Sequence, residues 1–144
     1  MKNPPISIAA PLALMTFALP QAAQASDAGD AVEPPPVELG RVHWRRNLDL
    51  GLASSRSSGK PVFALFQEIP GCITCQNFGT GPLSHPLLVE AIEELFVPVA
   101  TYNNRGGADA MVLKRYGEPS WNNPVVRFLD ADGADLIPRK DGVW

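Results

Sequence analysis

Residues 61–75 have the sequence PVFALFQEIPGCITC, and this stretch carries the clearest structural signal in the chain. Its first six residues, 61–66, form a continuous apolar run that is too short for a typical helix and rich in strand-forming residues. Such a run predicts a central strand buried on both faces, with Pro61 at its first position. The turn Pro70-Gly71 follows, and Cys72-Ile73-Thr74-Cys75 comes directly after it. We therefore expect a buried strand, a tight turn, and then a helix that begins at the cysteine motif.

The two cysteines have the spacing that thiol–disulfide exchange requires. At the start of a helix, Cys72 lies against unpaired backbone N–H groups and the positive end of the helix dipole, and both favour the thiolate. Cys75, one turn further on, can then resolve a mixed disulfide formed at Cys72. The same motif serves as half of a zinc site, but the chain has no other cysteine, and His43 and His85 are its only histidines. We expect no metal site. A copper site built from the two cysteines and His85 is the alternative.

Helical and strand patterns flank this motif on both sides. Trp44, Leu48 and Leu52 recur at helical spacing, and Ser57-Ser58-Gly59 ends the pattern, which predicts a first helix. An apolar stripe over 84–96, with Ser84 as N-cap, predicts a helix after the cysteines. We expect strands over 97–102 and 124–129, a short helix over 109–116, and a turn at 130–133 leading into 134–137. The order β-α-β followed by a β-hairpin predicts an α/β fold with a mixed sheet and helical cover.

The composition limits the chain to one small domain. It has 144 residues, a formal net charge of −3 and 45% hydrophobic residues. Two cysteines and two histidines provide neither a dense disulfide framework nor a structural zinc quartet. The nearly balanced charge, 12 basic against 15 acidic side chains, gives no basic footprint for nucleic acid.

Residues 1–25 have the features of a secretory signal peptide. Lys2 precedes an apolar run over 6–19, and Ala23-Gln24-Ala25 is a small-x-small pattern after which a signal peptidase would cut. The alternative is an uncleaved membrane anchor, but the run is short for a spanning helix of about 20 residues and Pro11 interrupts it. The protein is therefore expected to be exported, and to be periplasmic or secreted after cleavage.

We divide the rest of the chain into two parts. Residues 26–40 form an acidic, proline-rich linker around Pro34-Pro35-Pro36, and residues 41–144 form the folded domain. In an oxidising compartment, the two cysteines of this domain can be held as a disulfide.

Several segments together resemble the thioredoxin-like superfamily, and within it exported proteins of the thioredoxin-7 type. The segments are Trp44, Gly59-Lys60-Pro61-Val62, Phe66, Cys72-x-x-Cys75 and the stretch from Ser84 to Phe96-Val97-Pro98-Val99. In that family a helix precedes the GKPV strand, the cysteine motif opens the next helix, and a second helix leads into an FVPV strand. Residues 41–137 follow this order, so the resemblance implies a thioredoxin-like fold with a central mixed β-sheet flanked by helices.

The resemblance also implies roles for individual residues. Cys72 and Cys75 become the catalytic, redox-active pair. Pro124 becomes a cis-proline at the start of a later strand, where it faces the cysteines and presents backbone to a partner peptide. Gly71 and Trp121 border the same substrate site, although Trp121 could line either a substrate groove or a core edge.

This chain departs from thioredoxin in three ways. Gly71 precedes the first cysteine instead of a tryptophan, and Ile73-Thr74 lies between the cysteines instead of Gly-Pro. Phe66 occupies the position of the buried aspartate, so the nearest carboxylate is that of Glu68, which we expect to be solvated on its loop. The family's fold closes with a helix after the hairpin, whereas this chain ends at Val143-Trp144, and we expect that it is truncated.

The expected function is that of an exported thiol–disulfide oxidoreductase, active in cell redox homeostasis, which exchanges disulfides with exported proteins through Cys72 and Cys75. No bound cofactor is needed, and a membrane-borne redox partner must reset the pair. We expect a monomer that does not bind nucleic acid. The alternative is a non-catalytic binding module of the same fold, in which the two cysteines form a permanent structural disulfide. Whether the pair reduces or oxidises its substrates stays open.

Overall fold

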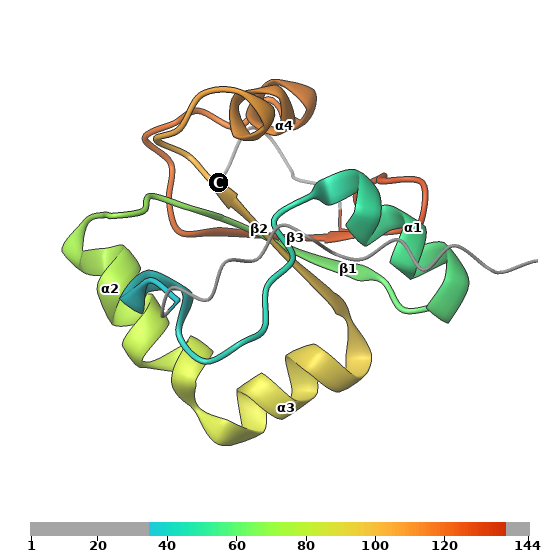
Figure 1. Cartoon of the computed structure of the whole chain (residues 1–144), viewed down its shortest axis with the longest axis horizontal. Helices are drawn as coiled ribbons and strands as arrows, with labels where there is room; N and C mark the ends of the chain where they lie inside the picture. The colour runs from blue at the N-terminus through green and yellow to red at the C-terminus, as the bar shows by residue number, and fades with distance from the viewer. Residues whose placement is uncertain (1–34, 138–144) are drawn as a thin grey trace, which may run out of the picture. The chain divides into compact units, whose positions relative to one another are not determined.

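The computed structural model describes residues 35–137, so the expected signal peptide and the Val143-Trp144 ending lie outside the described residues. The helices are α1 Leu48–Ser58, α2 Ile73–Thr80, α3 Pro86–Leu95 and α4 Ala108–Tyr116, with short 3-10 helices η1 Val37–Leu39 and η2 Pro82–Ser84. The strands are β1 Val62–Gln67, β2 Val97–Tyr102 and β3 Val125–Leu129, in the order β2-β1-β3. β1 runs parallel to β2 and antiparallel to β3. The predicted mixed sheet is confirmed (Figure 1).

The central position of β1 follows from its continuous apolar run. All six of its residues are buried, because both faces of the sheet are covered. Phe63 and Leu65 face a core cluster on the side of α2 and α3, whereas Val62, Ala64 and Phe66 face a second cluster on the side of α1 and α4. The fold therefore has three layers, with α2 and α3 on one face of the sheet and α1 and α4 on the other (Figure 1).

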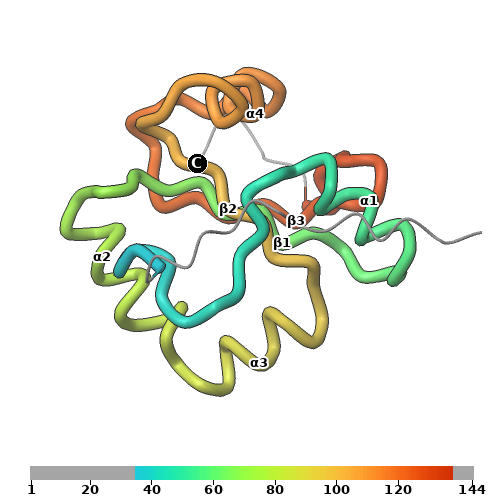
Figure 2. Tube along the Cα trace, viewed as in Figure 1, coloured from blue at the N-terminus to red at the C-terminus, as the bar shows by residue number. Residues whose placement is uncertain are grey.

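The first helix begins later than the sequence pattern predicted. α1 starts at Leu48, with the side chain of Asn47 accepting a hydrogen bond from the Leu50 backbone N–H at 3.0 Å. Trp44 lies before the helix, in a segment whose Arg45 forms a parallel bridge with Val99 of β2. Figure 2 follows this segment from η1 to the start of α1. Trp44 packs in the core cluster on one face of the sheet, and Leu48 packs in the cluster on the other face. Their helical spacing in the sequence therefore does not mean that both lie on one helix.

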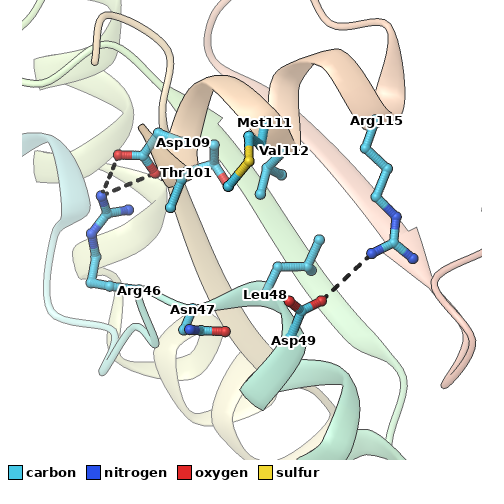
Figure 3. Close-up of a pocket in the computed structure, with 10 residues that line it drawn as sticks. Arg46, Asn47, Leu48, Asp49, Thr101, Asp109, Met111, Val112 and Arg115 are labelled. Atoms are coloured by element: carbon cyan, nitrogen blue, oxygen red, sulfur yellow. Dashed lines mark hydrogen bonds and ion pairs between the residues drawn. The ribbon is translucent and has the colours of Figure 1, made fainter. Parts of the chain in front are cut away.

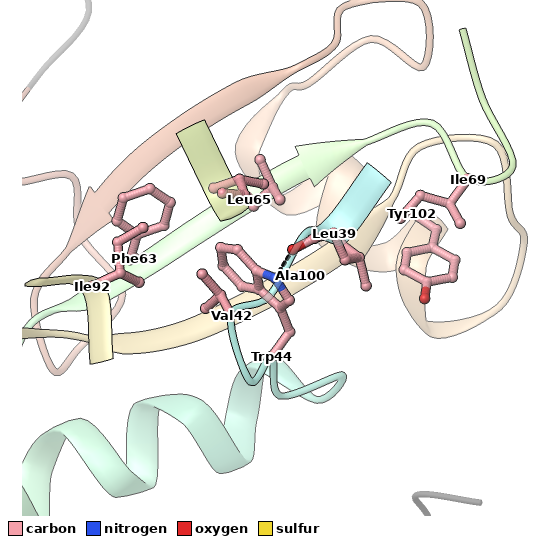
Figure 4. Close-up of a cluster of buried hydrophobic side chains, with 10 residues drawn as sticks. Leu39, Val42, Trp44, Phe63, Leu65, Ile69, Ile92, Ala100 and Tyr102 are labelled. Carbon is pink, nitrogen blue, oxygen red and sulfur yellow. Dashed lines mark hydrogen bonds between the residues drawn. The ribbon is translucent and has the colours of Figure 1, made fainter. Parts of the chain in front are cut away.

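The boundary predicted between a linker at 26–40 and a domain from residue 41 is wrong within the described residues. Glu38 and Leu39 of η1 are buried, and Leu39 belongs to the core cluster that also holds Trp44. The indole Nε1 of Trp44 donates to the Leu39 carbonyl at 2.8 Å (Figure 4). η1 packs on α2 so closely that a Cβ at Gly79 would lie 2.0 Å from the Val37 carbonyl oxygen. The folded domain therefore includes η1.

Two further predicted boundaries differ from the structure. The N-cap of α3 is His85, while the hydroxyl of Ser84 donates to the Gly79 carbonyl at 2.7 Å, so Ser84 braces the end of α2 instead of capping α3. The turn at 130–133 forms as predicted, but the returning segment makes a single bridge, Leu129 to Asp135, instead of a strand. Within residues 35–137, no helix is long and apolar enough to cross a membrane.

Candidate active site

Cys72 and Cys75 lie at the N-terminus of α2, as the sequence predicted. Cys72 is the N-cap residue, and its Sγ accepts a hydrogen bond from the Cys75 backbone N–H at 3.4 Å. Cys72 is partly exposed, Cys75 is buried, and both are free thiols. The two Sγ atoms lie 2.9 Å apart, so one thiol can donate a hydrogen bond to the other.

The two thiols have opposite pKa shifts. The hydrogen bond from the Cys75 thiol is the largest cause that lowers the pKa of Cys72, and the backbone N–H groups of Cys75 and Thr74 add to it. Burial raises the pKa of Cys75 to about 11, and its hydrogen bond to Cys72 acts in the same direction. The charge of Glu68 raises the pKa of both thiols. Cys72 is therefore suited to be the attacking thiolate, while Cys75 keeps its proton.

The turn before Cys72 explains why a glycine occupies position 71. A Cβ at Gly71 would lie 2.0 Å from the Glu68 carbonyl oxygen, so no larger residue fits without moving this turn. The Gly71 N–H donates to the Glu38 carboxylate at 2.9 Å, and the Gly71 carbonyl accepts from the Gln76 side chain at 3.2 Å. The turn also contains a cis peptide bond between Ile69 and Pro70.

Two buried polar residues, Gln67 and Glu38, contact the motif or the turn before it and were not predicted from the sequence. The side-chain amide of Gln67 donates to the Glu38 carbonyl and, at 3.2 Å, to the Cys75 carbonyl. Glu38 thus contacts the site through both its backbone and its carboxylate, although the sequence pattern had assigned it to a linker. Its position within an acidic, proline-rich stretch gave no sign of this burial.

The loop before β3 faces the cysteines from the other side. The Asn123–Pro124 peptide bond is cis, as the resemblance implied for Pro124. The side-chain oxygen of Asn123 lies 2.8 Å from Cys75 Sγ and 3.3 Å from Cys72 Sγ. Asn103 anchors this loop by donating to the Asn122 carbonyl at 2.8 Å. Asn123 was not predicted from the sequence, and the one signal for it was its position next to the predicted cis-proline.

Trp121 is not a core-edge residue. Its side chain is 74% exposed, two residues before Asn123 in the same loop. Ile73, which follows the first cysteine, is 68% exposed. Large apolar side chains are thus exposed both on α2 and on the facing loop, where they are available to a partner.

The position of the buried aspartate of thioredoxin is apolar here. Phe66 is buried in the core cluster on the side of α1 and α4, and its ring packs edge-on against Tyr116 with the centroids 5.9 Å apart. Glu68 is half-buried and acts on both sulfur atoms through its charge. The site therefore has a carboxylate near the thiols, two residues later in the chain than in thioredoxin.

The copper alternative does not fit the geometry. His85 follows the C-terminal end of α2, while the cysteines lie at its N-terminal end. Eight helical residues span about 12 Å, which is too far for one metal ion to bind His85 and both cysteines. Across residues 35–137, no group of three or more histidine, cysteine, aspartate or glutamate side chains could hold a metal.

A separate pocket of about 270 Å³ lies between the start of α1 and the length of α4 (Figure 3). Arg46 pairs there with Asp109 at 2.9 Å and stacks over the ring of Tyr102, while Arg115 approaches Asp49 at 3.7 Å. Neither cysteine lines this pocket. Each of its two arginines lies within 4 Å of a carboxylate, and the pocket is separate from the thiol site.

Comparison with known proteins agrees with this architecture. No curated protein matches the chain. A solved structure titled "DsbH Oxidoreductase" shares 17% sequence identity, covers 76% of this chain and 81% of its own, and superposes with a TM-score of 0.58, which shows the same fold. The model of the thioredoxin-like family Thioredoxin_7 matches residues 43–131, a range that includes the cysteine motif, the cis-proline and all three strands. Because that match spans more than half of the chain, the protein belongs to this thioredoxin-like family.

Proposed function

We propose that this protein is an exported thiol–disulfide oxidoreductase that exchanges disulfides with protein substrates through Cys72 and Cys75. The observation that carries the proposal is the inequality of the two thiols. The pKa of Cys72 is lowered, the pKa of Cys75 is raised to about 11, and their sulfur atoms are 2.9 Å apart. Exchange requires one thiol that ionises and attacks and a second that stays protonated until the first has reacted.

The reduction of a substrate disulfide then takes two steps. The Cys72 thiolate attacks one substrate sulfur, a bond forms between them, and the other substrate sulfur leaves as a thiolate. Cys75 next loses its proton, and its thiolate attacks the Cys72 sulfur and displaces the remaining substrate sulfur. Two protein thiols are oxidised to one disulfide, and one substrate disulfide is reduced to two thiols. The reverse sequence oxidises a substrate, and neither direction uses a bound cofactor.

The substrate chain is proposed to lie between the two segments that meet at the sulfur atoms. One segment contains Gly71 and Ile73 beside the attacking thiol. The other contains Trp121 and Pro124, which flank the Asn123 that touches both sulfurs. The exposed Trp121 and Ile73 side chains offer apolar contacts to a polypeptide, and the exposed part of Cys72 lies on the same α2 terminus.

The proposed location rests on the signal-peptide pattern of residues 1–25. A periplasmic or secreted thiol pair is separated from cytosolic reductants, so a partner must restore its starting redox state. We propose a membrane-borne thiol–disulfide protein for this role. The protein is proposed to act as a monomer.

A redox titration tests the proposed function. The protein is equilibrated in graded glutathione buffers, and its free thiols are counted by alkylation, with Cys72→Ser and Cys75→Ser as controls. We expect a reversible two-electron transition within roughly −120 to −270 mV, the range of known exchange proteins. A disulfide that stays closed below about −300 mV would identify a structural disulfide and favour a binding module instead.

A further inference from the structure

The side-chain oxygen of Asn123 completes a triangle with the two sulfur atoms. It lies 2.8 Å from Cys75 Sγ and 3.3 Å from Cys72 Sγ, and the sulfurs are 2.9 Å from each other. The Cys75 thiol has one proton and two acceptors within reach, the Cys72 sulfur and the Asn123 oxygen. When Cys72 is joined to a substrate as a mixed disulfide, its sulfur is no longer a thiolate and becomes a poor acceptor. The Asn123 oxygen is then the better acceptor for the Cys75 proton.

The contact of the Asn123 side-chain nitrogen fixes the orientation of its amide group. Its nitrogen lies 3.4 Å from the Ser120 carbonyl oxygen, which can only accept a hydrogen bond. Turning the amide over would place two oxygens against each other at Ser120. The amide therefore presents its acceptor to the sulfurs, and an acceptor favours the protonated form of a thiol.

An amide oxygen can hold a proton but is too weak a base to remove one from a thiol. Two carboxylates are near the motif. Glu68 raises the pKa of both thiols by its charge, and Glu38 accepts a hydrogen bond from the Gly71 N–H. Within residues 35–137, the side-chain acceptors in hydrogen-bond contact with Cys75 Sγ are the Cys72 sulfur and the Asn123 oxygen. The proton of Cys75 must therefore pass to water or to the departing substrate thiolate.

We propose that Asn123 holds the proton of the Cys75 thiol through its side-chain carbonyl and thereby prolongs the mixed disulfide between Cys72 and a substrate. The inference rests on the proposed function. In the step concerned, the S–H bond of Cys75 breaks and the released electron pair forms the bond to the Cys72 sulfur. The bond between Cys72 and the substrate sulfur breaks, and the substrate thiolate leaves with that electron pair and takes up a proton. A longer-lived mixed disulfide gives a bound substrate more time to rearrange or to be passed to another thiol.

The test follows the two steps separately with an aromatic disulfide, 5,5′-dithiobis(2-nitrobenzoate), as the substrate. Attack by Cys72 releases one coloured thiolate at a rate that depends on reagent concentration. Resolution by Cys75 releases the second at a rate that does not. Asn123→Leu keeps the bulk of the side chain without its polar atoms, and Asn123→Ala removes the bulk as well. We expect both variants to speed the second release about fivefold, because one neutral hydrogen bond of about 1 kcal/mol corresponds to that factor.

Two controls accompany these variants. Asn77→Ala makes the same change at an exposed position of α2 and should leave both phases unchanged. Cys75→Ser should show the first release alone. In the unaltered protein, the rate of the second release should rise with pH above pH 7, because Cys75 must ionise before it attacks and its burial raises its pKa.

The possible results separate this inference from the proposed function. If the unaltered protein shows both phases but the second phase is unchanged or slower in both Asn123 variants, the role of Asn123 is refuted and the proposed function is not. A second phase whose rate does not change between about pH 7 and pH 9 in the unaltered protein would also refute it, because Cys75 would then have no proton to hold, and this measurement needs no variant to fold. A protein that releases no coloured thiolate would refute the proposed function and the role of Asn123 together.

Discussion

Arg127 on β3 is expected to fix the loop that presents Asn123 and Pro124 to the cysteines. Its Nε donates to the Glu118 carboxylate at 2.6 Å, and one of its terminal nitrogens donates to the Asp135 carboxylate at 2.6 Å. The other terminal nitrogen donates to the Tyr116 carbonyl at 2.9 Å. Glu118 begins the segment that leads to the cis-proline, so the ion pair between Arg127 and Glu118 connects residues 118–124 to β3. Replacing Arg127 by methionine removes all three hydrogen bonds while keeping most of the side-chain volume.

The size of the effect follows from burial. The side chains of Arg127 and Glu118 are 7% and 0% exposed, whereas that of Asp135 is 28% exposed and can turn towards water. Removing one partner of a buried ion pair costs about 3–5 kcal/mol, because the other charge is left in the interior. For a domain of about 100 residues, each kcal/mol lowers the melting temperature by about 4–8 °C. Arg127→Met should therefore melt at least about 12 °C below the unaltered protein.

Thermal and urea unfolding, followed by circular dichroism on the full chain, measure this loss. The matched variant is the double replacement Arg127→Met with Glu118→Leu, which removes both charges. It should recover most of the lost stability, because apolar residues of similar volume often replace a buried ion pair without loss. A loss below about 1 kcal/mol for Arg127→Met, or a double variant no more stable than the single one, would refute the reasoning.

Three further predictions concern the thiols and the turn before them. Glu68→Gln should lower the pKa of both cysteines, because the carboxylate raises both, so alkylation of Cys72 at neutral pH should be faster; a slower reaction would contradict this. Cys75→Ala removes the strongest influence that lowers the Cys72 pKa, since alanine has no side-chain donor, so the midpoint of Cys72 alkylation should move to higher pH; a shift to lower pH would count against it. Gly71→Ala should destabilise the protein by about 1–3 kcal/mol in urea unfolding, because its Cβ meets the Glu68 carbonyl oxygen at 2.0 Å. Gly106→Ala, where a Cβ meets nothing within 4 Å, is the control, and equal losses in the two variants would refute the steric argument.

The parts of the fold that could be predicted from the sequence are those set by local pattern. The apolar run over 61–66 identified the central strand, because a strand covered on both faces needs apolar residues at every position. The placement of Cys72 at a helix N-terminus followed from the turn before it. The spacing of Trp44 and Leu48 gave a wrong helix start, because an extended segment and a helix contributed residues at helical spacing to different faces of the sheet.

The parts that could not be predicted depend on contacts between distant segments. Asn123 meets Cys75 across 48 positions in the sequence; its place beside the predicted cis-proline put it near the cysteines, but no local pattern showed that its amide contacts both sulfur atoms. Glu38 meets Gly71 across 33 positions, and its acidic, proline-rich surroundings are typical of a linker. In both cases the polar group is placed by the packing of a neighbouring element, so its role appears once the fold is known.

The most direct test of the central claim is to identify which cysteine first forms a bond to a substrate sulfur. Reduced protein is mixed with glutathione disulfide, the reaction is quenched with acid after short times, and mass spectrometry locates the attached glutathione. We predict that Cys75→Ser accumulates glutathione on Cys72, that Cys72→Ser accumulates almost none in the same time, and that the unaltered protein proceeds to a Cys72–Cys75 disulfide. Equal modification of the two variants, or an unaltered protein that forms neither product, would contradict the assignment of Cys72 as the attacking thiol and Cys75 as the resolving one.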